Sequence, residues 1–172
     1  MNKGFTLIEV VIYLALFSII IGGGMVAVYG IIQSTDAGNN QIILQEEANF
    51  ILRKIDWTLT GAISITTPAN PTPTTNLILT KNISGSPTLF TFEINSNDVI
   101  CPVKYLCLKR GSAMSQLNTN LFQLNSSSIS ISNLSFKKTP TGNGIETNFT
   151  LTTEQNGRNV SQVFTTTKYL RN

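Results

Sequence analysis

The arrangement of apolar and polar positions divides the chain into a long helical part and a β-rich part. Residues 10–32, VVIYLALFSIIIGGGMVAVYGII, contain no charged side chain. A run of about 20 apolar residues is long enough to cross the hydrocarbon core of a membrane as a helix. The pattern therefore predicts a membrane-spanning helix near the amino terminus.

A second helical pattern begins at Gln41 and continues to about Ala62. Its apolar residues recur at three- and four-residue spacing, which places them on one face of a helix. They are Leu44, Ala48, Ile51, Ile55, Leu59 and Ala62. Between the two patterns, residues 33–40 read QSTDAGNN and are rich in turn formers. Propensity alone would therefore separate two helices here.

The rest of the chain alternates between apolar and polar residues with a period of two, which is typical of half-buried strands. Residues 66–76, TTPANPTPTTN, cannot continue a helix because proline lacks the backbone donor, so they read as a connecting loop. Alternating runs follow at residues 77–80, 88–94, 104–108, 128–131, 134–136, 145–153 and 160–169.

Turn-forming residues at 141–144 and 156–157 favour hairpins between the last runs. Short alternating runs joined by such turns predict an antiparallel meander with one buried face. That face needs a cover, and the apolar stripe between Leu44 and Ala62 supplies one. The predicted fold class is α+β, with a long N-terminal helix packed against an antiparallel sheet.

Composition narrows the range of functions. The chain has 12 Lys and Arg against 9 Asp and Glu, and the excess is scattered without a basic tract, so no direct nucleic-acid site is evident. Histidine is absent, which removes the commonest general base and metal ligand. Spacing nominates no catalytic set, glycine-rich phosphate loop or metal-carboxylate cluster. We therefore expect a protein that is not an enzyme and uses no cofactor or metal.

The two cysteines, Cys101 and Cys107, lie close together in CPVKYLC. Two cysteines without histidine cannot complete a structural zinc site, which needs four ligands. A local disulfide is plausible if the domain is exported. The alternative is a pair of reduced, buried thiols.

Charge distribution gives the orientation. Lys3 and the terminal amine are the positive charges on the near side of the apolar run, so the positive-inside tendency keeps that end cytoplasmic. The residues from about Gln33 onward are then outside, which suits their low charge and many Ser, Thr and Asn residues. Segments that fit the Asn-x-Ser/Thr pattern are numerous enough to arise by chance; they begin at Asn82, Asn125, Asn133, Asn148 and Asn159.

Residues 4–9, GFTLIE, resemble the processing site of type IV prepilins and of type II secretion pseudopilins. In that family a membrane peptidase cuts after the glycine and N-methylates the new first residue. The resemblance makes Gly4 the residue before the cut, Phe5 the methylated terminus and Glu9 the family's acidic residue. In the family this glutamate is thought to neutralise the terminal amine of a neighbouring subunit during assembly.

A local interpretation of Glu9 also exists. Thr6-x-x-Glu9 before an apolar run is the sequence signature of a capping box, which satisfies backbone donors at a helix start. The two roles can coexist. The capping box alone does not predict the preceding Gly4 and Phe5.

The resemblance implies four segments: a leader at 1–4, a membrane and assembly half of one long helix at 5–33, its amphipathic half at 34–65, and an exported domain at 66–172. If residues 5–65 form one helix, we expect its least stable point near Gly38. The three glycines at 22–24 permit two interpretations: close helix packing in lipid, or a soft segment that unwinds on assembly.

The implied function is that of a filament subunit, assembled into a type IV pilus or a secretion-type pseudopilus. The partners are prepilin peptidase, other pilin or pseudopilin subunits and an assembly platform in the cytoplasmic membrane. In the resembled family the helix of a major pilin usually contains a proline, and no proline precedes Pro68 in this chain. The resemblance therefore favours a minor pilin or pseudopilin over a major pilin. A monomeric, membrane-anchored extracytoplasmic binding protein is the alternative from another class.

Overall fold

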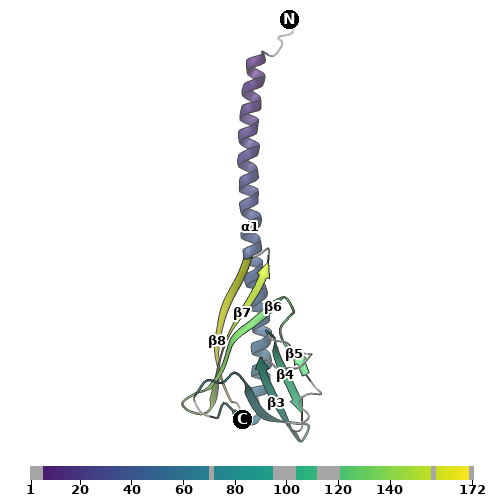
Figure 1. Ribbon diagram of the computed structural model, residues 1–172, viewed down its shortest axis with the longest axis vertical. Coiled ribbons are helices and arrows are strands. Elements are labelled where there is room, and N and C mark those ends of the chain that lie inside the picture. Colours follow the sequence, from purple (N-terminus) through teal and green to yellow (C-terminus); the bar gives the residue numbers. More distant parts are fainter. Residues whose placement is uncertain (1–5, 70–71, 95–103, 112–120, 156–157, 171–172) are drawn as a thin grey trace. The chain divides into compact units, whose positions relative to one another are not determined.

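The computed structural model describes residues 6–69, 72–94, 104–111, 121–155 and 158–170. In this part of the chain one helix precedes eight strands (Figure 1). Residues up to Asn40 form one compact unit, and residues from Gln41 onward form a second.

Helix α1 spans Leu7–Leu59, and every residue of the QSTDAGNN segment at 33–40 is helical. The expectation of one long helix is therefore confirmed. Adding a residue to an existing helix costs far less than starting a new one, so strong flanking helices carry a segment of weak propensity.

The end of α1 differs from the prediction. The helix was expected to reach about Ala62 and its amphipathic half residue 65, whereas α1 stops at Leu59 and strand β1 covers Ala62–Thr67. Gly61 adopts φ +73°, the left-handed conformation that glycine accepts readily and that terminates helices. Thr60 N still donates to Asp56 O at 2.9 Å, which closes the last turn before the chain changes direction.

Five strands form an antiparallel sheet in the order β1-β2-β3-β4-β5. After β1 they are β2 (Leu77–Ile83), β3 (Ser86–Ile94), β4 (Leu106–Gly111) and β5 (Leu121–Gln123). The predicted runs at 77–80 and 88–94 fall in β2 and β3, whereas β1 and β5 were not predicted. Ser84 and Gly85, both at positive φ, make the two-residue turn between β2 and β3.

Three strands form a second antiparallel sheet in the order β6-β7-β8: β6 (Ile129–Lys138), β7 (Gly144–Gln155) and β8 (Arg158–Tyr169). The predicted runs at 128–131 and 134–136 belong to one strand, β6, interrupted by a bulge between Ser132 and Ser135. The predicted hairpin at 141–144 is confirmed, since Gly142 at φ +76° turns β6 into β7. The predicted turn at 156–157 lies outside the described residues.

The predicted buried stripe of α1 is confirmed. Leu44, Ile51 and Ile55 are completely buried, and Ala48 and Leu59 almost so. Phe90 and Phe92 from β3 contribute to the same core, as do large side chains of the second sheet, among them Phe136, Phe149, Ile145 and Leu151. Both sheets therefore pack their apolar faces around residues 44–59 of α1, and the α+β class is confirmed (Figure 1).

The predicted single meander is instead split into two sheets at Asn125. The Asn125 amide is buried; its Oδ1 accepts from Leu106 N at 2.8 Å and its Nδ2 donates to Ile129 O at 2.6 Å. A side chain thus takes the hydrogen bonds that a continued strand would have made. The same bonds leave this amide unavailable as a glycan acceptor.

Replacing Asn125 by alanine is expected to lower the free energy of unfolding by about 1–3 kcal/mol, because Leu106 N–H and Ile129 C=O then lie buried without a partner. Denaturant unfolding of the full chain in micelles measures the change. Asn82→Ala, at an exposed position in β2, is the matched control. Equal unfolding midpoints for the two variants would contradict the role assigned to Asn125.

Candidate functional site

The start of α1 brings Thr6 and Glu9 together, as the capping-box pattern predicts. Thr6 N and Thr6 Oγ1 both donate to Glu9 Oε2, at 2.9 and 2.8 Å. Glu9 N in turn donates to Thr6 O at 3.1 Å. Glu9 therefore satisfies the backbone N–H of Thr6, the residue just before α1. Its negative charge is also favourable there, because the helix dipole is positive at this end.

These bonds occupy only one oxygen, Oε2, of the Glu9 carboxylate. The side chain is exposed, and its second oxygen, Oε1, forms no hydrogen bond within the described chain. An acceptor thus remains for a donor from another molecule. Gly4 and Phe5, predicted as the cleavage and methylation positions, lie outside the described residues.

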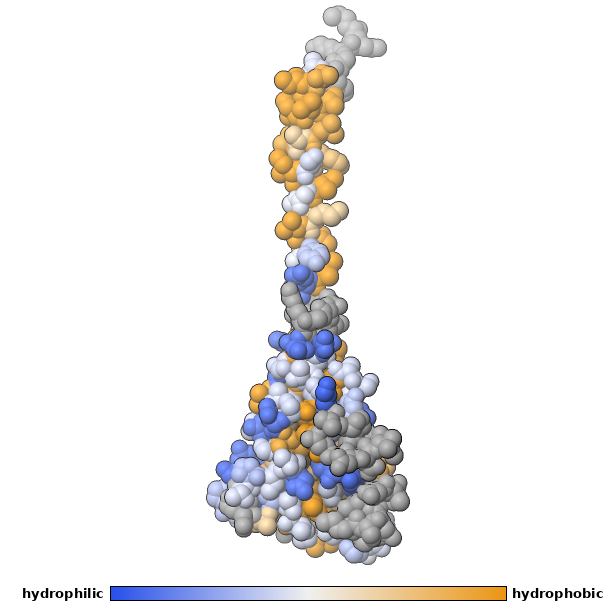
Figure 2. Space-filling view, viewed as in Figure 1, coloured by the Kyte–Doolittle hydropathy of each residue, from blue (hydrophilic) through white to orange (hydrophobic). Residues whose placement is uncertain are grey.

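The residues that follow Glu9 present an apolar surface all around the helix. Large side chains such as Phe17, Ile20 and Met25 are more than half exposed (Figure 2). By length and composition this helix is suited to crossing a membrane. The Ser18 hydroxyl is satisfied within the helix, because Ser18 Oγ donates to Leu14 O at 2.7 Å.

Within the Gln41–Asn172 unit, α1 carries a second apolar stripe that sequence reasoning missed. Ile43, Phe50 and Trp57 are seven residues apart, which places them on one helix face, and they remain 47%, 39% and 49% exposed. The seven-residue spacing of these three residues could have revealed the second stripe. It was overlooked because the stripe from Leu44 to Leu59 contains more apolar residues.

Lys81 stabilises the end of α1. Its Nζ donates to Trp57 O at 2.6 Å and lies 4.2 Å from the centroid of the Trp57 ring. A cation here compensates the free carbonyls at a helix end. Burial lowers the pKa of Lys81 below its usual 10.5, because the ammonium loses part of its hydration.

Of the two cysteines singled out in the sequence, the structure describes one. Cys107 is buried and disulfide-bonded, and Cys101, the other cysteine of the chain, lies outside the described residues. Among the residues that the structure describes, no group of three or more Cys, Asp or Glu side chains is arranged to hold a metal ion.

An exposed, long apolar helix near the amino terminus, with a capped glutamate in its first turn, fits a membrane-anchored protein. Residues 1–25 match the family model of the prokaryotic N-terminal methylation motif, which is the prepilin-type cleavage and methylation motif. No curated protein and no solved structure matches the chain. The motif supports a place in the type IV pilin or pseudopilin family, and it contains Gly4, Phe5 and Glu9.

Proposed function

We propose that the chain is a minor pilin or pseudopilin, a structural subunit without enzymatic activity. Prepilin peptidase cuts after Gly4 and methylates Phe5. The subunit then assembles through α1, on a platform in the cytoplasmic membrane, into a type IV pilus or a type II secretion-type pseudopilus. Before assembly, the amino terminus faces the cytoplasm and the β-rich domain lies outside.

The observation that carries this proposal is the position of Glu9 in the methylation motif and in the first turn of an exposed apolar helix. A carboxylate costs several kcal/mol in a membrane unless a partner compensates it. Thr6 supplies two neutral donors, which stabilise the helix start but do not neutralise the charge. A cationic amine on a neighbouring subunit would neutralise it.

The outer half of α1 supports assembly as well. The exposed stripe formed by Ile43, Phe50 and Trp57 offers apolar area for helix-to-helix packing at heptad spacing. Glu46 and Arg53, which flank Phe50, give such a contact charged borders. We assign this stripe to contacts between subunits in the filament.

The sharpest test of processing is mass spectrometry of the native amino terminus. We expect a chain that begins at Phe5 and carries one N-methyl group. The control is the same gene expressed in cells without prepilin peptidase, where Met1 or Asn2 should begin the chain. Filaments that contain an intact leader would overturn the proposal, and an uncut monomer in the presence of the peptidase would favour a simple membrane-anchored protein.

A further inference from the structure

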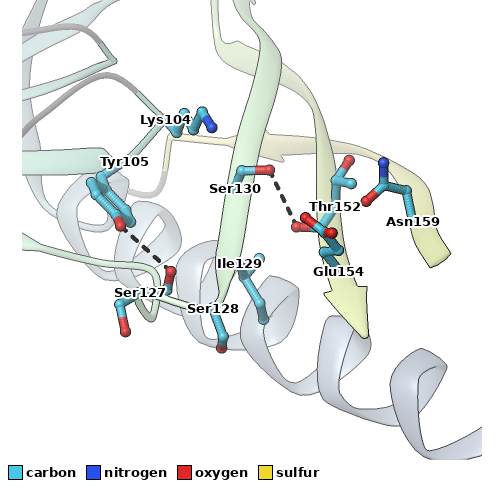
Figure 3. A pocket seen from close by; sticks show the side chains of 9 residues that line it. All are labelled: Lys104, Tyr105, Ser127, Ser128, Ile129, Ser130, Thr152, Glu154 and Asn159. Carbon is cyan, nitrogen blue, oxygen red and sulfur yellow. Dashed lines mark hydrogen bonds between the residues drawn. The ribbon is translucent and has the colours of Figure 1, made fainter. Parts of the chain in front are cut away.

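A polar cavity of about 360 Å³ opens within the Gln41–Asn172 unit, outside every residue assigned to assembly above. One wall is formed by Lys104 and Tyr105, which precede β4, and the others come from the second sheet and the turn before β6 (Figure 3). Nine residues line the cavity, and most carry a hydroxyl, an amide or a charge.

The backbone holds the first wall in place. Lys104 adopts φ +96°, a strained conformation for a residue with a side chain. Ile131 N donates to Lys104 O at 3.0 Å, which fixes this residue against β6. The buried amide of Asn125 binds the next residue but one, at Leu106 N. The cavity is therefore built by interactions that do not depend on a ligand.

Two opposite charges face this cavity without neutralising each other. Lys104 and Glu154 both line it, and in Figure 3 they flank Ser130. Neither forms an ion pair or a side-chain hydrogen bond with any residue in the described ranges. Each thus offers a charge-assisted hydrogen bond to a ligand, stronger than one between neutral groups.

Between these charges the cavity is rich in neutral hydrogen-bonding groups. Ser130 Oγ donates to Thr152 O at 3.3 Å and keeps its lone pairs free to accept. The side-chain amide of Asn159, at the far wall in Figure 3, forms no hydrogen bond with the described residues. Tyr105 adds an aromatic ring.

This combination discriminates between ligand classes. An anion that approaches Lys104 is repelled by Glu154. A cation that approaches Glu154 is repelled by Lys104. A neutral polyhydroxyl compound uses both, because a hydroxyl donates to a carboxylate and accepts from an ammonium. We propose that this cavity binds a neutral saccharide.

The test uses the full chain in a micelle of an amine-oxide detergent, which has no sugar headgroup to compete. Saturation-transfer NMR against a panel of neutral mono- to tetrasaccharides, with glycine and sialic acid as zwitterionic and anionic probes, should show transfer to at least one neutral saccharide. Glu154→Gln and Lys104→Met should each weaken that binding about tenfold or more, since each removes one charge-assisted hydrogen bond.

Matched controls are Glu146→Gln and Lys137→Met, the same substitutions outside the cavity. They should bind like the unchanged chain, and all four variants should keep its melting temperature because no described hydrogen bond or ion pair is lost. The proposal is overturned if no neutral saccharide shows transfer, if glycine or sialic acid is preferred, or if cavity and control variants weaken binding equally. None of these outcomes bears on processing or assembly.

Discussion

Glu9→Val is expected to reach the membrane and be cleaved after Gly4, yet to be absent from filaments. Valine keeps the apolar character of the helix and removes the charge that we assign to the neighbouring amine. Leaving one member of a buried charge pair unpaired costs about 3–5 kcal/mol, which corresponds to about a hundredfold or larger loss of incorporation. Quantitative immunoblotting of sheared filaments against the membrane pool measures this ratio.

Valine also removes the cap on Thr6, so a second variant is needed to separate the two roles. Glu9→Gln keeps an oxygen that accepts from Thr6 N and Thr6 Oγ1, as glutamine does in capping boxes, but it carries no charge. We expect the Glu9→Gln variant to assemble as poorly as the Glu9→Val variant. Normal assembly of Glu9→Gln would show that the cap alone explains Glu9.

Ile51→Ala is expected to lower the free energy of unfolding of the β-rich unit by about 2–5 kcal/mol. Ile51 is completely buried in the centre of the stripe that both sheets cover, so its removal leaves a cavity among well-packed side chains. Denaturant unfolding of the full chain in micelles, followed by near-ultraviolet circular dichroism, reports this loss.

The neighbouring residue supplies the control. Phe50 is 39% exposed on the other face of α1, so Phe50→Ala should cost far less stability although it removes a larger side chain. We expect the opposite order for assembly, because Phe50 belongs to the stripe assigned to subunit contacts. If Phe50→Ala destabilises the unit as much as Ile51→Ala, the two faces of α1 have been assigned wrongly.

Periodic features of the fold could be predicted from sequence. The stripe from Leu44 to Leu59 was predicted because apolar residues repeat there with the helix period, and the structure shows it buried. Most strands were predicted because apolar residues repeat in them with the strand period. Glu9 was found because a carboxylate before a long apolar run is costly and therefore conspicuous. Its contact with Thr6 was predicted too, since spacing alone determines it.

Features that depend on single residues or on distant contacts could not be predicted. The left-handed conformation of Gly61 ends α1 early, although the apolar spacing continues to Ala62. Strand β5 has only three residues, too few to show alternation. The division into two sheets depends on the Asn125 side chain, whose partners are 19 residues before it and four after it.

The strand order has a consequence for folding during the export that we propose. Within each sheet every strand after the first pairs with the strand synthesised just before it. Hairpins of neighbouring strands close quickly because short loops cost little entropy. In the export that we propose, each new strand emerges after the strand with which it pairs, and α1 emerges before both sheets. Vectorial export and folding thus proceed in the same direction.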